Sequence, residues 1–175
     1  MDAVTLAEQA KQVYASGDFI KAADLFAQTA EAYRAAGDAL NAAEMLNNQS
    51  VAFLQVGKAA EAFQATDGTE TVFEQAGDLK RQGIAVANRA RALELLKKHS
   101  EAMQEYNRAA ELFERAGEGD MHAMVRKATS ELFLKRGYIA NSQMEILDSI
   151  RLAEKPTLAQ RLLKLMMRLG LFRPQ

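Results

Sequence analysis

The stretch Ala36-Gly37-Asp38 decides the fold, because it returns at a spacing of 40 residues as Ala76-Gly77-Asp78 and as Ala116-Gly117-Glu118. Glycine suits the left-handed residue that ends a helix, and an Asp directly after it can cap the next helix. A second set of turns lies twenty residues out of phase, at Gly17, Gly57, Lys97 and Gly137. Two breaks in each period predict two helices per repeat, each of about eighteen residues.

The side chains that must pack keep the same 40-residue register. Small residues stand seven positions before each turn of the second set, at Ala10, Ser50, Ala90 and Ser130, and five positions after it, at Ala22, Ala62, Ala102 and Ser142. Aromatic residues stand sixteen positions after the turn, at Tyr33, Phe73 and Phe113. Small residues let paired helices approach closely, so the pattern predicts an all-α protein built from helix pairs.

The small-aromatic-small pattern resembles the tetratricopeptide repeat, most clearly in Gly17-Asp18-Phe19-Ile20-Lys21-Ala22-Ala23-Asp24-Leu25-Phe26 and in Glu101-Ala102-Met103-Gln104-Glu105-Tyr106-Asn107-Arg108-Ala109. The standard repeat has about 34 residues, so this chain resembles the long-helix variant of that superfamily. The resemblance implies a right-handed α-solenoid of stacked antiparallel helix pairs, closed by a C-terminal capping helix. Four repeats are expected, at about 3–37, 38–77, 78–117 and 118–155.

Three positions depart from the repeat pattern. Thr66 stands where Phe26 and Tyr106 are aromatic, Arg126 stands where earlier repeats are apolar, and Lys97 replaces a turn glycine. The second and fourth repeats are therefore expected to be the loosest. Thr66-Asp67-Gly68-Thr69 forms helix poorly, which predicts a kink or a local weakness there.

Composition and charge exclude several classes. The absence of Cys removes disulfides, thiolate metal ligands and a cysteine nucleophile. Residues 151–175 carry six bases and one acid, a net charge of +5, which leaves −6 on residues 1–150 of a chain whose formal charge is −1. A body with that charge is not expected to wrap nucleic acid. No secretory signal or spanning segment is recognised, so a cytoplasmic location is expected.

The resemblance implies that the first helix of each repeat lines a concave groove that binds a partner protein or peptide. The expected partner-binding residues, carried over by register, are Lys11, Tyr14, Asn47, Asn48, Asn88, Arg91, Lys127 and Glu131. Asn48 and Asn88 occupy the position where the family commonly bonds a peptide main chain, although an Asn there can equally bond a neighbouring helix. Arg91 and Lys127 are either partners for acids or simply solvated. The carboxylate clamp of chaperone-binding members is matched only at Asn48, so that ligand is not expected.

The sequence contains no candidate residues for an enzyme active site. His99 and His122 have no second ligand at metal spacing and no nucleophile beside them, and no Gly-rich phosphate loop occurs. Both histidines are therefore interpreted as surface or packing residues. No catalytic residue, cofactor or metal is predicted, and the expected function is that of an adaptor or scaffold.

The C-terminal segment 156–175 differs from the repeats. Pro156 marks its boundary, and residues 157–169 read as a helix with one leucine-rich stripe and one basic stripe. A cap for the last repeat is the first interpretation. Homo-oligomer formation, docking to a partner, and peripheral contact with an anionic membrane are the alternatives, and they define a second function, that of an assembly subunit.

Overall fold

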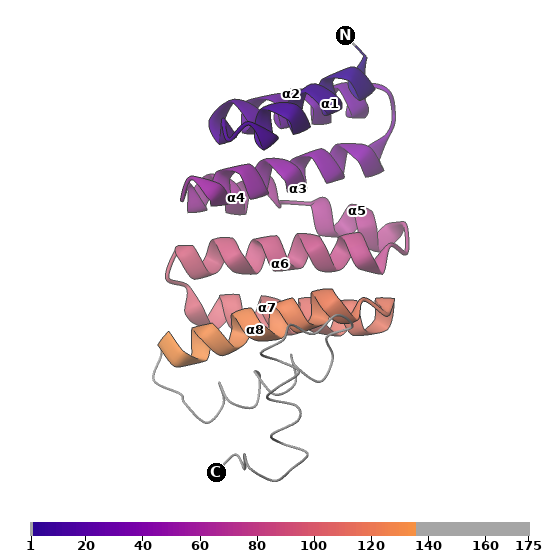
Figure 1. Cartoon of the computed structure of the whole chain (residues 1–175). Coiled ribbons are helices and arrows are strands. Elements are labelled where there is room, and N and C mark those ends of the chain that lie inside the picture. Colours follow the sequence, from indigo (N-terminus) through magenta and orange to yellow (C-terminus); the bar gives the residue numbers. More distant parts are fainter. Residues whose placement is uncertain (1, 136–175) are drawn as a thin grey trace, which may run out of the picture. The chain divides into compact units, whose positions relative to one another are not determined.

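The computed structural model describes residues 2–135, and every regular element in that part of the chain is an α-helix, as the sequence predicts (Figure 1). The helices are α1 (Ala3–Ala15), α2 (Phe19–Ala35), α3 (Ala39–Gln55), α4 (Ala59–Ala65), α5 (Thr69–Gln75), α6 (Leu79–Leu95), α7 (His99–Ala116) and α8 (Gly119–Lys135). The predictions for Gly137, Ser142 and the segment 156–175 lie outside the described residues. The chain divides into two compact units, residues 1–105 and residues 106–175.

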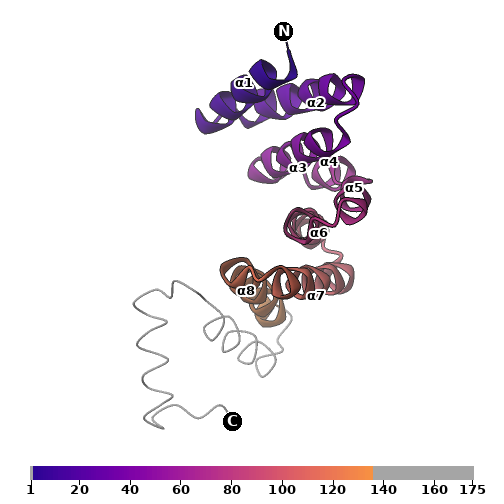
Figure 2. The same cartoon turned by 90° about the vertical axis from the view of Figure 1, so that its right-hand side faces the viewer.

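From α1 to α4, each helix of the first unit packs antiparallel to the one before it, and α6 packs in the same way against α5. Contacts join α1 to α2, α2 to α3 and α3 to α4, and α6 packs against α3, α4 and α5. Figure 2 shows that α1, α3 and α6 lie along one side of this unit, and that α2, α4 and α5 lie along the other. The first unit is therefore a two-layered array of helices.

The turns form where the sequence predicts them. Gly37 and Gly77 take left-handed backbone angles, with φ of +77° and +69°. Asp38 then caps α3 by accepting a bond of 3.0 Å from the Asn41 N–H, and Asp78 caps α6 by accepting one of 2.9 Å from the Arg81 N–H. These backbone bonds stabilise the carboxylate form and hold the pKa of both side chains below the usual range.

Lys97 is the one non-glycine residue with a positive φ, +63°, in the described part of the chain. Its side chain is exposed and makes no ion pair there, whereas a left-handed angle costs an L residue roughly 1–2 kcal/mol. We expect Lys97→Gly to raise the free energy of unfolding by about 0.5–1 kcal/mol after the extra entropy of glycine is subtracted. Urea denaturation followed by circular dichroism measures this gain.

Gly57→Ala is the matched control for the Lys97 prediction, because Gly57 ends the equivalent helix with φ of +73° and a Cβ there would meet nothing within 4 Å. This change should lower the free energy of unfolding by about 1 kcal/mol through the backbone alone. A loss of stability in Lys97→Gly would contradict the strain argument.

The small residues of the 40-residue register lie at helix contacts. Ala10, Ala22, Ala62, Ala90 and Ala102 are all fully buried. Their small size allows the backbones of paired helices to approach closely, and the aromatic residues Phe73 and Phe113 are also buried, each in its own unit. The packing register predicted from the sequence is confirmed at these positions.

The second helix of the second repeat is interrupted, where the sequence predicts a kink. α4 ends at Ala65 and α5 begins at Thr69, each helix has seven residues, and Gly68 takes a φ of +71°. The Thr66 and Thr69 hydroxyls bond the carbonyls of Phe63 and Thr66, at 2.7 and 2.8 Å. The two side chains thus satisfy the backbone at the point where helical bonds are lost.

In the second unit, the polar residue that departs from the repeat pattern is held by hydrogen bonds. Arg126 is half-buried, and its Nε lies 3.2 Å from His122 Nε2 while its Nη1 lies 3.5 Å from Asn107 Oδ1. His122 is itself buried, in agreement with its interpretation as a packing residue. No helix within residues 2–135 is long and apolar enough to cross a membrane.

Candidate partner-binding site

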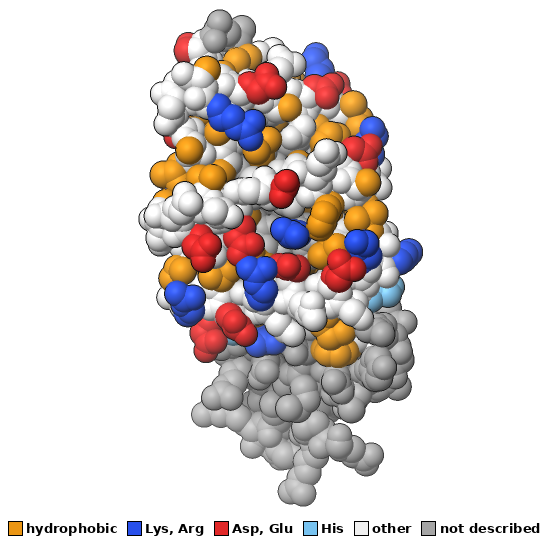
Figure 3. Space-filling view, turned by 180° about the vertical axis from the view of Figure 1, so that it is seen from behind, with side chains coloured by type: hydrophobic (Ala, Val, Ile, Leu, Met, Phe, Trp, Pro, Cys, Tyr) orange, Lys and Arg blue, Asp and Glu red, His pale blue; other side chains and the backbone are white. Residues whose placement is uncertain are grey.

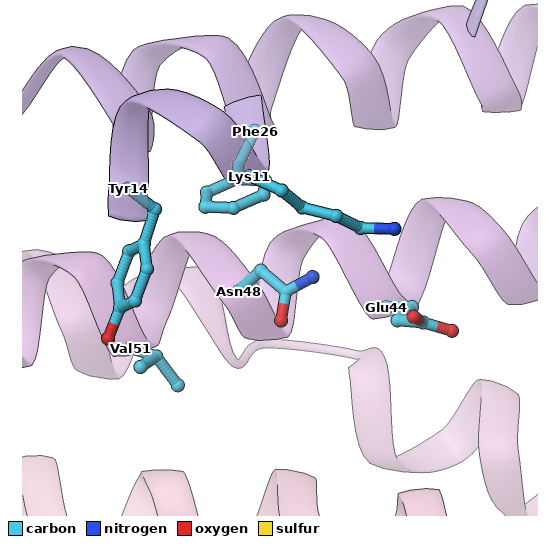
Figure 4. A pocket seen from close by; sticks show the side chains of 6 residues that line it. All are labelled: Lys11, Tyr14, Phe26, Glu44, Asn48 and Val51. Carbon is cyan, nitrogen blue, oxygen red and sulfur yellow. The ribbon is translucent and has the colours of Figure 1, made fainter. Parts of the chain in front are cut away.

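A pocket of about 340 Å3 opens between α1, α2 and α3 on the side of the first unit that carries α1, α3 and α6. Six residues line it, and we call it the Tyr14–Asn48 pocket: Lys11, Tyr14, Phe26, Glu44, Asn48 and Val51. In Figure 4, Asn48 lies in the middle, Tyr14 and Val51 lie at one end, and Lys11 and Glu44 extend at the other. The structure therefore brings together three of the predicted binding residues, Lys11, Tyr14 and Asn48.

Aromatic contacts hold Tyr14 in place. Its ring meets Phe19 edge to face, with centroids 5.1 Å apart, and lies 6.4 Å from the ring of Phe26. These contacts lock the side chain while its hydroxyl makes no hydrogen bond to any described residue. A fixed ring with a free hydroxyl is a ready hydrogen-bonding group for a ligand.

Asn48 reaches the pocket from the middle of α3, where it is half-buried. Within residues 2–135, neither its amide nitrogen nor its carbonyl oxygen has a hydrogen-bond partner from the chain. In the structure, Asn48 therefore does not bond a neighbouring helix of the described chain. One side chain here offers a free donor and a free acceptor to the pocket.

The two charged residues of the pocket are paired within the chain. Lys11 Nζ lies 2.9 Å from Glu8 Oε1, and this bond raises the pKa of Lys11 above its ordinary value. Glu44 Oε2 lies 3.2 Å from Nη1 of Arg81, whose Nε lies 2.6 Å from Asp78 Oδ2. The pocket thus combines balanced charges with free neutral polar groups.

Asn47 lies elsewhere, and its predicted place in the groove is wrong. Only 5% of the residue is exposed, and its Oδ1 lies 3.5 Å from the Thr69 hydroxyl on α5, whose hydrogen is directed to the nearer carbonyl of Thr66 at 2.8 Å. Neighbouring residues on a helix point about 100° apart, so Asn47 is turned into the packing of α3 against α5 while Asn48 faces the pocket. Thr69 is the first residue of α5, directly after the interruption, and its hydroxyl lies beside the Asn47 amide.

Asn88 and Arg91 lie on α6 and do not line the Tyr14–Asn48 pocket. The amide nitrogen of Asn88 is buried and has no hydrogen-bond partner. Arg91 Nη1 pairs at 2.8 Å with the buried carboxylate of Glu94, three residues further along the helix. Lys127 and Glu131 are exposed on α8, in the second unit. Asn88 and Arg91 are therefore separate from the Tyr14–Asn48 pocket, and Lys127 and Glu131 are described within their own unit.

Two further hollows, of about 370 and 260 Å3, open where α2 and α3 meet α4 and the interruption after it. Both are lined by Arg34, Leu46 and Asp67, and the second also by Gly68. Figure 3 shows the side of α2, α4 and α5, on which acidic, basic and hydrophobic side chains are interspersed over the first unit. The sequence reasoning missed these hollows, although the Thr66-Asp67-Gly68 departure marks the place.

No group of three or more metal-ligating side chains occurs within residues 2–135. No protein-family model matches the sequence, and a comparison with curated proteins also gives no match.

Proposed function

We propose that this chain is a non-enzymatic, cytoplasmic adaptor or scaffold that binds an extended peptide or a helix of a partner protein on the side formed by α1, α3 and α6. The observation that carries the proposal is the Tyr14–Asn48 pocket, in which a fixed Tyr hydroxyl and an Asn amide lack partners from the chain. A peptide main chain offers the complementary donors and acceptors.

The proposed architecture is a right-handed, tetratricopeptide-like α-solenoid. Its support is the 40-residue recurrence of turns and buried small residues, together with packing between helices that are adjacent in sequence. Such arrays place equivalent helices side by side along one face, and successive repeats can therefore contact successive parts of an extended ligand. In this proposal, the pocket between α1 and α3 is the first of these contacts.

The double variant Asn48→Ala, Tyr14→Phe tests the proposed function. Neither side chain makes a hydrogen bond within the described chain, and Phe keeps the ring contacts with Phe19 and Phe26. We expect unchanged helicity and melting temperature. A partner recovered with the unchanged chain by affinity purification from the native cell should bind the double variant at least about tenfold more weakly.

Lys21→Met on α2 is the control for this experiment, because Lys21 is exposed and does not line the Tyr14–Asn48 pocket. It should recover the partner as the unchanged chain does. Equal affinity of the double variant and the unchanged chain for every recovered protein would remove the pocket from the binding surface.

A further inference from the structure

The charged side chains of the Tyr14–Asn48 pocket differ from its neutral polar side chains in what they already bind. Lys11 and Glu44 each have an ionic partner outside the pocket lining, at 2.9 and 3.2 Å. Asn48 and Tyr14 have no hydrogen-bond partner among residues 2–135. The groups that remain available to a ligand are therefore the uncharged ones.

The lining also has no net charge, because it contains one base and one acid. The Glu8–Lys11 pair is exposed, with 52% of the Lys11 side chain accessible, and pairs of this kind contribute roughly 0–1 kcal/mol. A ligand could break the pair, but Glu8 stays beside Lys11 and Glu44 lies on the facing helix. An acidic ligand residue that approached Lys11 would therefore also approach the carboxylates of Glu8 and Glu44.

For a basic ligand residue, the acid of the lining is already paired with another residue of the chain. Glu44 is the acid in the lining, and Arg81 already binds it while also binding Asp78 at 2.6 Å. The Arg81 guanidinium further rests on the Phe73 ring, 5.3 Å from its centroid, so it is held from three directions. A ligand cation would have to displace this fixed group, or remain in the pocket without a partner, which costs free energy.

The remaining surface of the pocket is apolar. Phe26 is a buried residue of the lining, Val51 is half-buried, and the Tyr14 ring forms one end. The volume of about 340 Å3 lies near the lower limit of small-ligand pockets, which span roughly 300–1,000 Å3. Such a space suits one apolar side chain together with the main chain that carries it.

We propose that the Tyr14–Asn48 pocket selects an uncharged segment of its partner, in which one apolar side chain packs on Phe26 and Val51 and the flanking main chain bonds Asn48 and Tyr14. This inference rests on the proposed peptide-binding function and adds the chemistry of the peptide. In this inference, the neutral groups of the pocket carry recognition.

A display library of random linear peptides, selected on the full chain and counter-selected on Asn48→Ala, provides the probe. We expect the recovered peptides to share an apolar residue flanked by uncharged residues. Synthetic copies should bind Asn48→Ala about tenfold more weakly and bind Lys21→Met as they bind the unchanged chain. Their affinity should change by less than about twofold between ~0.1 M and ~1 M NaCl, over which the Debye length falls from ~10 Å to ~3 Å.

A charge scan of one such peptide completes the test. Asp or Lys placed beside the apolar residue should each weaken binding by about tenfold or more, whereas Asn at the same position should be tolerated. If one sign of charge strengthens binding at low salt and the gain disappears at high salt, the inference is overturned while peptide binding by the pocket stands. If no selected peptide distinguishes Asn48→Ala from the unchanged chain, both the inference and the proposed function fail.

Discussion

Phe73→Ala is expected to lower the free energy of unfolding of the first unit by about 3–5 kcal/mol. The Phe73 ring is 0% exposed and packs with Ala43 and Ala85, and it also carries the Arg81 guanidinium on its face. Truncation leaves a cavity that alanine neighbours cannot fill, because their side chains have no freedom to move into it. Urea denaturation followed by circular dichroism gives the change.

Val56→Ala is the control for Phe73→Ala, since Val56 is 41% exposed and lies outside the helices. Its expected effect is within about 0.5 kcal/mol. A loss below about 1 kcal/mol in Phe73→Ala would mean that α5 contributes little to the stability of the first unit.

Ala22→Leu is expected to lower the free energy of unfolding by roughly 1–3 kcal/mol. Ala22 is 0% exposed and lies in the first turns of α2, within the core cluster that contains Ala10 and Phe26. A larger side chain at this point must push α2 away from its neighbours or leave its preferred rotamer. Thermal and urea denaturation of the variant measure the cost.

Ala35→Leu provides the comparison for Ala22→Leu, because Ala35 is exposed at the end of the same helix. The two changes add the same atoms, so the difference between them isolates the packing cost. Equal stability of the two variants would show that the small residues of the repeat register are not needed for close helix approach.

The helix boundaries could be predicted from sequence because their causes are local. Turn glycines and the Asp caps of α3 and α6 act within a few residues, and the structure has left-handed angles at every predicted turn within its described part, including Lys97. The interruption after α4 follows in the same way from Thr66-Asp67-Gly68. The buried small residues were predictable because the repeat presents the same packing position several times.

The pocket could be predicted only in part, because its geometry depends on contacts between distant residues. Asn47 and Asn48 are chemically identical, and the packing of α3 against α5, which brings Thr69 from 22 positions away, decides which of the two amides is buried. The same holds for Glu44, whose partner Arg81 is 37 positions away. Pairs three residues apart on one helix, such as Glu8–Lys11 and Arg91–Glu94, are visible in the sequence. That the Glu8–Lys11 pair limits the charge of a ligand follows only from the structure, which places Lys11 in the lining of the pocket.

Arg81 contacts both the lining of the Tyr14–Asn48 pocket and the short helix α5. Its guanidinium lies 3.2 Å from the carboxylate of Glu44, which lines the pocket, and 5.3 Å from the centre of the Phe73 ring, which belongs to the short helix α5. Arg81 therefore connects the lining of the pocket to α5, beside the direct contacts that α3 makes with α5. We expect a shift of the Phe73 ring to move the Arg81 guanidinium, and with it the ion pair that holds Glu44 at the wall of the pocket.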